Sequence, residues 1–490
     1  MNQKQKEYFD KLKNKKVHIL GFLGREGMAI LNFLYDKGIR NITAHDFTDE
    51  KDARKKFDLI QTALEDDEKE IEFNKLLRKD INFCYKDTYL QNIDNADVVY
   101  VSQNWYTYKT NKPLEEAIKK KDIKLTGIMD MYFELCSFPI IGITGSNGKT
   151  TTTNLTGHLI SKSTDKKVFI SGNDMFAKPV LNKILNYNKD EAVLVLEISN
   201  RHLKMFTHKP HIAVLTNLSP NHLAEHGGWE GYVNDKANIF RYMDKGYTVL
   251  NRDDENTKMI DKLVNNKIVY FSKSKIIDNE YAVYKDNNTI YYKENKSITP
   301  LCNLSDIKIP GEHNLENSLA ALSVSVLMNA DIEKLPEAIR NYKAVKERLQ
   351  LVTTFKGIQF YNDISCTTPE SAIHALNTLS NGNRNIIHIL GGEDKDMNFT
   401  KLNELINKVD KKVIAFPGNG TDKILKEVKP ELVERFNDIV KAIDYSYSIA
   451  EQGDIILISP ACAFFKREYV EPKKMDDYIL EFVEKAKKLN

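Results

Sequence analysis

The residues best suited to chemistry lie in the stretch 140–151, where an apolar run gives way to glycines at every third position and then to a lysine and two threonines. Strand, glycine loop and helix in this order are typical of a phosphate-binding loop, because backbone N–H groups and the helix N-terminus attract anions. Lys149 would neutralise phosphate oxygens, and Thr150 could ligate Mg²⁺. The strict pattern has glycine at position 143, whereas here Gly142 comes one residue earlier. A glycine-rich turn that binds nothing is the alternative.

An acidic residue is expected at the end of a second strand. Residues 192–196 form a continuous apolar run that Glu197 follows. Such runs are typical of buried parallel strands, whose C-terminal ends face the ligand crevice of an open α/β sheet. Glu197 is therefore placed to hold Mg²⁺, directly or through water, unless it is an ordinary acid at a strand end.

Four further residues have open interpretations from their own chemistry. His222, in a loop after a strand, is either a metal ligand or an ordinary loop residue. Lys236 lies in a helix-like segment and is interpreted as a surface lysine, as most lysines are. Asn314 and Asn317, three residues apart where a helix over 318–328 starts, share a face and could bond a base or a phosphate, or cap the helix.

The elements that must position these residues alternate between strands and helices. The N-terminal part begins with a strand at 16–20, a glycine loop at 21–27, a helix at 28–37 and a strand at 42–45 that ends in Asp46. These are the parts of a Rossmann-like half, in which the acid can bond a ribose hydroxyl. The glycine spacing also fits a tight turn without a ligand.

The C-terminal part repeats the alternation, with strands predicted at 359–363, 385–390, 412–416 and 454–459. Thr368 is expected to cap a helix whose first residue is Pro369. Within the central part, the stretch 248–310 predicts short strands that flank the main sheet.

The predicted fold class is α/β with three domains. A Rossmann-like N-terminal domain would span 1–137, a central P-loop domain with a mostly parallel sheet 138–345, and a C-terminal Rossmann-like domain 346–490. Pro139 marks the first boundary, since it directly precedes the strand of the phosphate loop.

Composition excludes several classes of protein. The chain has 490 residues, 71 basic and 69 acidic, so its net charge of +2 predicts no nucleic-acid or anionic-membrane partner. No apolar run approaches the ~18 residues of a membrane span, and the N-terminus lacks a signal-peptide stretch, which predicts a cytoplasmic protein. The five scattered cysteines argue against a disulfide framework and a zinc site.

Taken together, the motifs resemble the Mur ligase family in order and spacing over essentially the whole chain. The motifs are 142–151, Glu197, 217–222, Lys236, His313-Asn314 with Asn317, Arg348, Asn362-Asp363, Gly391-Gly392 with Lys395, and 459–463. Within the family, the chain looks most similar to the members that add D-glutamate to UDP-N-acetylmuramoyl-L-alanine in peptidoglycan precursor synthesis. Folylpolyglutamate synthetase resembles the last two domains, but lacks a full Rossmann-like domain before its phosphate loop.

The resemblance implies roles for individual residues. Lys149, Glu197, His222 and Lys236 would be catalytic. Mg²⁺ ligands would be Thr150, Glu197, His222 and Lys236, the last as a carbamate. ATP would be held by Gly145, Ser146, Asn147, Gly148, Lys149, Thr150, Thr151, Asn314, Asn317, Arg348 and Asp363. The UDP substrate would lie near Gly24, Arg25, Asp46 and Asn173, and the amino acid near Thr367 and Lys395.

The implied reaction is amide formation through an acyl phosphate, in a protein expected to be a monomer. The sequence departs from the family in three places. Ser102-Gln103-Asn104-Trp105 replaces a common Ser-Pro-Gly, residues 363–367 read Asp-Ile-Ser-Cys-Thr in place of Asp-Ser-Lys-Ala-Thr, and Phe464 replaces a serine. Two alternatives follow: a related ligase that adds another amino acid such as L-glutamate, and a nucleotide-binding homologue without catalysis.

Overall fold

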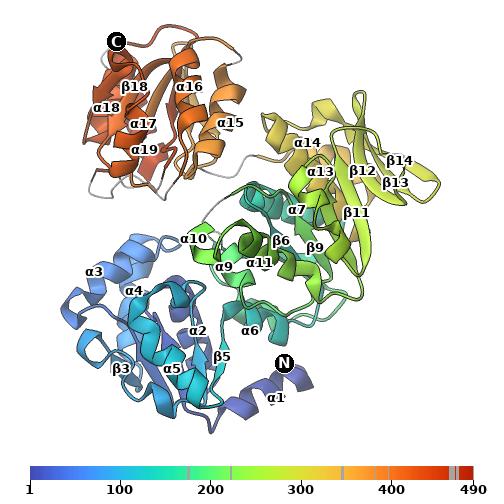
Figure 1. Ribbon diagram of the computed structural model, residues 1–490, viewed down its shortest axis with the longest axis vertical. Helices are drawn as coiled ribbons and strands as arrows, with labels where there is room; N and C mark the ends of the chain where they lie inside the picture. Colours follow the sequence, from blue (N-terminus) through green and yellow to red (C-terminus); the bar gives the residue numbers. More distant parts are fainter. Residues whose placement is uncertain are drawn as a thin grey trace. The chain divides into compact units, whose positions relative to one another are not determined.

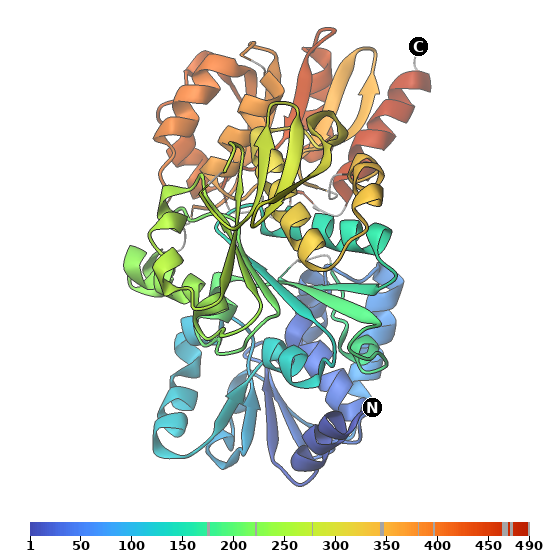
Figure 2. The same ribbon diagram turned by 90° about the vertical axis from the view of Figure 1, so that its right-hand side faces the viewer.

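The computed structural model of the protein describes residues 1–173, 177–220, 223–276, 278–343, 347–380, 382–394, 397–462, 469–470 and 474–488. The chain forms two compact units, one made of residues 1–306 and 317–339 and the other of 307–316 and 340–490. Figure 1 and Figure 2 show the elements of each unit from two directions. The first unit contains two sheets and the second contains one.

The first sheet has five parallel strands in the order β3-β2-β1-β4-β5. Its strands are β1 (Val17–Leu20), β2 (Ile42–His45), β3 (Asn82–Cys84), β4 (Val98–Tyr100) and β5 (Lys124–Thr126). The helices of this part are α1 (Gln3–Leu12), α2 (Arg25–Asp36), α3 (Ala53–Ile60), α4 (Asp66–Leu77), α5 (Lys112–Lys120) and α6 (Ile128–Leu135). The order reverses between β1 and β4, which is the position where open α/β sheets bind ligands. The Rossmann-like character predicted for this part is confirmed.

The second sheet has nine strands in the order β14-β13-β12-β11-β10-β9-β6-β8-β7. They are β6 (Ile140–Thr144), β7 (Lys167–Gly172), β8 (Ala192–Glu197), β9 (Ile212–Leu215), β10 (Tyr247–Asn251), β11 (Lys267–Ser272), β12 (Tyr281–Asp286), β13 (Thr289–Glu294) and β14 (Ser297–Asn303). Only the pairs β12–β13 and β13–β14 are antiparallel. The strands predicted merely to flank the main sheet at 248–310 therefore belong to it, because β10 continues the parallel ladder from β9.

The helices that follow these strands are α7 (Lys149–Ser163), α8 (Leu181–Ile184), α9 (Asn200–Leu203), α10 (Leu223–His226), α11 (Trp229–Arg241), α12 (Glu255–Lys258), α13 (Glu312–Leu327) and α14 (Leu335–Arg340). Helix α13 begins at Glu312, earlier than the predicted start at residue 318. Every residue of β6 and β8 is buried, as expected for central strands with both faces covered.

The second unit holds a six-stranded sheet in the order β15-β16-β20-β17-β18-β19, with only β15 antiparallel. Its strands are β15 (Gln350–Phe355), β16 (Ile358–Asn362), β17 (Ile386–Gly391), β18 (Asp410–Phe416), β19 (Val433–Arg435) and β20 (Ile455–Ile458), and its helices are α15 (Pro369–Ser380), α16 (Thr400–Val409), α17 (Asn419–Leu425), α18 (Ile439–Ser448) and α19 (Met475–Lys488). Figure 2 shows the strands between helices on either side.

Strand β17 shows why this sheet needs two layers of helices. Ile386 and Leu390 pack into the apolar cluster on one face, while Ile387 and Ile389 pack into the cluster on the other face. Side chains alternate along a strand, so an uninterrupted apolar run has both faces to bury. The predicted cap of α15 is confirmed, since Thr368 Oγ1 accepts a hydrogen bond of 3.2 Å from Ser371 N.

All five cysteines are buried. Among the residues that the structure describes, none of the helices combines the length and the apolar character needed to cross a bilayer. The domain boundaries at 137/138 and 345/346 stay a prediction.

Candidate active site

The phosphate-binding loop connects the end of β6 to the start of α7. Gly145 and Gly148 have φ of +155° and +81°, in the region that favours glycine. A Cβ on Gly145 would lie 1.9 Å from Thr216 Oγ1, and one on Gly148 would lie 2.2 Å from Asn317 Oδ1. Both positions therefore require glycine for conformation and for space. Gly142 lies inside β6 and contributes to packing rather than to the cradle.

The segment after β9 holds this loop in shape. Asn217 O accepts a hydrogen bond of 3.0 Å from Ser146 N, and Asn217 Oδ1 accepts one of 2.9 Å from Asn147 N. Asn147 O in turn accepts from Thr216 Oγ1 at 2.6 Å and from Asn217 Nδ2 at 3.1 Å. The loop is thus fixed from its outer side, which leaves N–H groups at the start of α7 for an anion.

Lys149 folds back over the loop. Its Nζ donates to Gly145 O at 2.9 Å and to Ser146 O at 2.7 Å. Thr150 is buried in the first turn of α7, and Thr151 beside it is half-buried. A lysine over the loop and a buried threonine at the N-terminus of a helix are the parts that the phosphate-loop motif predicts.

Glu197, the last residue of β8, lies at the neighbouring strand end and is only 2% exposed. Its Oε1 accepts a hydrogen bond of 3.1 Å from Asn173 Nδ2. Its Oε2 is buried and has no hydrogen-bond partner among the residues that the structure describes. A buried carboxylate oxygen without a donor suits a cation, since burial of unpaired charge is costly.

Lys236, on α11, is 1% exposed, so its interpretation as a surface lysine was wrong. Its Nζ donates to Gly145 O at 2.9 Å and to Thr144 Oγ1 at 3.3 Å. Burial lowers the pKa of Lys236 well below its ordinary value, the positive charge of Lys149 lowers it further, and Glu197 opposes the shift. Sequence periodicity could not show this, because the helix turns a polar residue toward the loop and not toward solvent.

The two asparagines predicted to share a helical face have separate roles. Asn317 is buried against the phosphate loop, where its Oδ1 accepts a hydrogen bond of 3.2 Å from Thr152 Oγ1. Asn314 belongs to the second unit, and its Nδ2 donates to Pro310 O at 2.6 Å at the start of α13. This hydrogen bond is not a helix cap, because the unpaired groups at a helix N-terminus are donors and need an acceptor. The base- or phosphate-binding role of Asn314 stays a prediction.

In the second unit, Asp363 directly follows β16 and is buried. It accepts hydrogen bonds from Leu349 N at 2.9 Å and Ser459 Oγ at 2.8 Å. Burial raises the pKa of Asp363 to about 6, although these hydrogen bonds and the charge of Arg348 oppose the shift. Thr367 lies half-buried in the loop before α15.

Two predicted site residues, His222 and Lys395, lie outside the described residues. The described part of the chain contains no group of three or more His, Cys, Asp or Glu side chains arranged as a metal site. Thr150 and Lys236 are neither His, Cys, Asp nor Glu, so a metal site made of Thr150, Lys236 and Glu197 would not count as a group of this kind.

The residues predicted for the UDP substrate lie around the edge of the first sheet and the end of β7. Gly24 is the N-cap of α2 and Arg25 its first residue. Asp46 is buried, and its Oδ1 accepts from Lys56 Nζ at 2.6 Å and from Thr48 N at 3.0 Å. Asn173 lies beside Glu197. The UDP roles of these residues stay a prediction.

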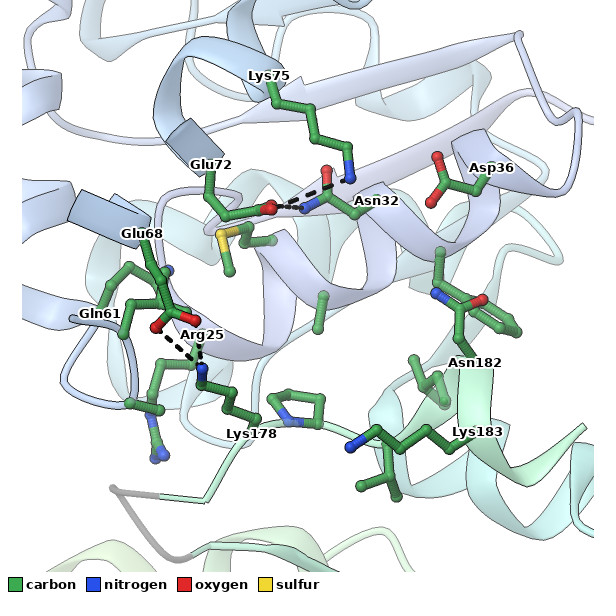
Figure 3. A pocket seen from close by; sticks show the side chains of 18 of the residues that line it. Arg25, Asn32, Asp36, Gln61, Glu68, Glu72, Lys75, Lys178, Asn182 and Lys183 are labelled. Carbon is green, nitrogen blue, oxygen red and sulfur yellow. Dashed lines mark hydrogen bonds and ion pairs between the residues drawn. The ribbon is translucent and has the colours of Figure 1, made fainter. Parts of the chain in front are cut away.

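Arg25 also borders a cavity of about 550 Å³ formed by α2, α4 and residues 178–183. Figure 3 shows Lys178 crossing beside Arg25 to Glu68, whose two oxygens accept its hydrogen bonds at 2.7 and 2.9 Å. The ion pair connects the first sheet's helices to the segment after β7 within the first unit. Sequence analysis gave no indication of this cavity.

Four polar residues beside the site have no signal in the sequence: Glu26, Gln103, Ser199 and His202. They connect to Asn173 through hydrogen bonds. Their separation along the chain, 176 residues for Glu26 and His202, leaves no local signal.

A phosphate loop, a buried carboxylate at the next strand end and a buried lysine define the class as an α/β nucleotide-binding enzyme of the P-loop type. Two family models match the chain, the Mur ligase middle domain at residues 143–325 and the Mur ligase glutamate ligase domain at residues 347–462.

Curated relatives match almost the full length. The chain is 32% identical over 477 residues to UDP-N-acetylmuramoylalanine--D-glutamate ligase of Acetivibrio thermocellus, covering 95% of each chain. It is 34% identical to the enzyme of the same name from Caldicellulosiruptor bescii, covering 92% of this chain and 94% of that one. The crystal structure of UDP-N-acetylmuramate-alanine ligase MurC from Thermotoga maritima has the same fold, with a TM-score of 0.55 and 17% identity, covering 97% and 100% of the two chains.

The chain belongs to the Mur ligase family, whose members are ATP-dependent ligases of peptidoglycan synthesis. The fold and the family predicted from the sequence are therefore confirmed.

Proposed function

We propose that this protein uses ATP and Mg²⁺ to join D-glutamate to UDP-N-acetylmuramoyl-L-alanine, as an acid–amino-acid ligase. One observation carries the choice of substrates: the relatives that match over 90% or more of the chain bear the name of the D-glutamate ligase. The geometry of the phosphate loop, Glu197 and Lys236 supports the ATP-dependent part of the reaction.

In the first step, a carboxylate oxygen of the UDP substrate attacks the γ-phosphorus of ATP, and the bond from that phosphorus to ADP breaks. Two anions must approach each other, so positive charge has to surround the transferred group. Lys149 can leave its two carbonyl partners for phosphate oxygens. N–H groups at the start of α7 supply further partial positive charge.

Thr150, Glu197, His222 and a carbamylated Lys236 would hold Mg²⁺. The free Oε2 of Glu197 fits a cation, and the buried Lys236 amine with its low pKa fits reaction with CO₂, because a neutral amine is the nucleophile. Bound there, Mg²⁺ would reduce the repulsion between the nucleotide phosphates and the attacking carboxylate.

In the second step, the amine of glutamate attacks the acyl carbon, phosphate leaves with the bonding electrons, and the nitrogen loses a proton. The products are the amide, ADP and phosphate. Thr367 and Lys395 would hold the glutamate, and Asn314, Asn317, Arg348 and Asp363 would contact the nucleotide. No side chain acts as a covalent nucleophile.

Phosphate release from the purified protein tests the proposal. With ATP, Mg²⁺ and UDP-N-acetylmuramoyl-L-alanine present, we expect release with D-glutamate and none with L-glutamate or without amino acid. Release with L-glutamate alone would favour a related ligase that adds L-glutamate. The differences from the family sequence at residues 364–366 are the reason to test this alternative. Nucleotide binding without release under any condition would identify a homologue that has lost catalysis.

A further inference from the structure

We propose that Gln103, Ser199 and His202 form a hydrogen-bonded relay that fixes the side-chain amide of Asn173 against Glu197, and so makes them positioning residues for the metal-facing carboxylate. The relay lies within the first unit and begins at Glu26, the residue after Arg25. It rests on the proposed function in one respect, the assignment of Glu197 to Mg²⁺.

The half of the relay nearest the site runs from Glu197 to Ser199. Asn173 Nδ2 is 3.1 Å from Glu197 Oε1, and Gln103 Nε2 is 3.0 Å from Asn173 Oδ1. Ser199 Oγ is 2.5 Å from Gln103 Oε1. Each amide therefore uses both of its ends, one toward Glu197 and the other away from it.

The far half ends on a second carboxylate. His202 Nδ1 is 3.0 Å from Ser199 Oγ, and His202 Nε2 is 3.0 Å from Glu26 Oε1. Glu26 Oε2 accepts a further hydrogen bond of 3.1 Å from Gln103 N, which ties both ends of this half together. Burial alone would raise the pKa of Glu26, but His202, the Gln103 N–H group and Arg25 together hold it below its ordinary value.

The direction of every hydrogen bond in the near half follows from Glu197. An ionised carboxylate only accepts, so Asn173 must present its NH₂ group to Glu197 and its carbonyl oxygen to Gln103. Gln103 must then donate from Nε2, and its Oε1 must accept the only hydroxyl hydrogen of Ser199. No amide can flip without placing two acceptors in contact.

The far half then requires two donors on one ring. Ser199 Oγ has used its hydrogen, so His202 Nδ1 must donate to it, and the ionised Glu26 requires a donor at His202 Nε2. Both ring nitrogens of His202 therefore face acceptors. Every donor between His202 and Glu197 thus points toward Glu197, and hydrogen bonds in such chains reinforce one another.

The consequence for Glu197 is that Oε1 is committed to Asn173, which leaves Oε2 for a cation. Partners of this kind orient metal ligands and contribute to metal affinity. The relay also joins the two sheets of the first unit. Glu26 and Gln103 follow β1 and β4 of the first sheet, whereas Asn173 follows β7, Glu197 ends β8, and Ser199 and His202 lie at the start of α9. A displacement of the start of α2, which carries Arg25 and Glu26, would therefore reach Glu197.

The test compares two substitutions of equal size at one position. Gln103→Met removes both hydrogen bonds of the side chain. Gln103→Glu keeps the acceptor for Ser199 but presents a second acceptor to Asn173, which must turn its NH₂ group away from Glu197. Binding of a fluorescent ATP analogue is titrated with Mg²⁺, without substrate or amino acid, so the result does not depend on which amide the enzyme makes.

We expect Gln103→Met to weaken the apparent Mg²⁺ affinity about 10-fold and Gln103→Glu to weaken it more. Simple electrostatics predicts the opposite order, because an added negative charge attracts Mg²⁺. Gln5→Met is the matched control, since buried Gln5 also loses a hydrogen bond of 2.8 Å, to Leu135 O, outside the relay. This control should bind Mg²⁺ as the wild type does.

His202 provides a second test if the Gln103 variants unfold. His202→Ala should weaken Mg²⁺ binding, and His202→Asn should restore part of it, because an amide can replace Nδ1 as the donor to Ser199. Equal affinity in wild type, Gln103→Glu and His202→Ala would overturn the relay. If the Mg²⁺ affinities follow the predicted order, with wild type tightest, then Gln103→Met, then Gln103→Glu, but no amino acid supports phosphate release, the relay stands and only the proposed function is overturned.

Discussion

The contact between Gly148 and Asn317 yields a prediction of defined size. Gly148→Ala places a Cβ in the left-handed region, at φ +81°, which costs about 1–2 kcal/mol for a non-glycine residue. The same Cβ would lie 2.2 Å from Asn317 Oδ1, which accepts a hydrogen bond from buried Thr152. Forcing these groups apart adds about 1–3 kcal/mol, so the free energy of unfolding should fall by about 2–5 kcal/mol.

Gly38→Ala is the matched control, since Gly38 has a φ of +87° but its Cβ would meet nothing within 4 Å. The two tryptophans of the chain, Trp105 and Trp229, both lie in the first unit. Their fluorescence during urea unfolding therefore reports this unit. The free energy of unfolding should fall more in Gly148→Ala than in Gly38→Ala, and this difference measures the clash between the new Cβ and Asn317 alone.

The single variants Gly148→Ala and Asn317→Ala and the double variant that combines them form a double-mutant cycle. Removal of the Asn317 amide makes room for the new Cβ, so the two changes together should cost less than the sum of the separate costs. Strict additivity, or equal losses in Gly148→Ala and Gly38→Ala, would refute the argument that Asn317 excludes a side chain at the loop.

Two further outcomes follow from buried titratable groups. Lys236→Ala should abolish phosphate release, and formate or acetate should restore part of it by replacing the carbamate; full activity in the variant would exclude that role. For Asp363, the raised pKa of about 6 means that the folded form binds the proton more tightly than the unfolded form, whose pKa is near the ordinary 3.8. Stability of the second unit should therefore fall by about 3 kcal/mol as pH rises from about 4 to about 6 and stay level above. Asp363→Asn should remove this dependence, as measured by hydrogen exchange of the β16 amides, corrected for intrinsic rates; an unchanged pH profile would contradict it.

The sequence predicted the elements that depend on local patterns. The apolar run of β8 and its terminal Glu197 have the predicted bounds, and the loop between β6 and α7 has the predicted form. These signals are local, because strand burial and glycine conformation depend on a few consecutive residues.

Properties that depend on packing between distant segments were not predictable. From its own chemistry Lys236 was interpreted as a surface residue, because nothing in α11 reveals that one face lies against β6 and the loop. Only the resemblance to the family placed it at the site. Gly142 was expected in the phosphate-binding loop. A Cβ at this position would instead contact Ile198 and Ile239, so the lack of a side chain allows helix α11, which carries Ile239, to pack closely against β6. The hydrogen-bonded chain from Glu26 to Glu197 joins residues that no motif connects.

The carbonyl oxygen of Gly145 accepts hydrogen bonds from both Lys149 and Lys236, each at 2.9 Å. The charge of Lys149 helps to keep the pKa of Lys236 low. A polyphosphate would neutralise that charge and draw Lys149 away, which would make Lys236 easier to protonate and less reactive toward CO₂. For the carbamate proposed at Lys236, the order of the two events matters, because the amine would react with CO₂ most readily before the nucleotide binds. A protein stripped of CO₂ and then saturated with ATP should therefore become active more slowly than one given CO₂ before ATP.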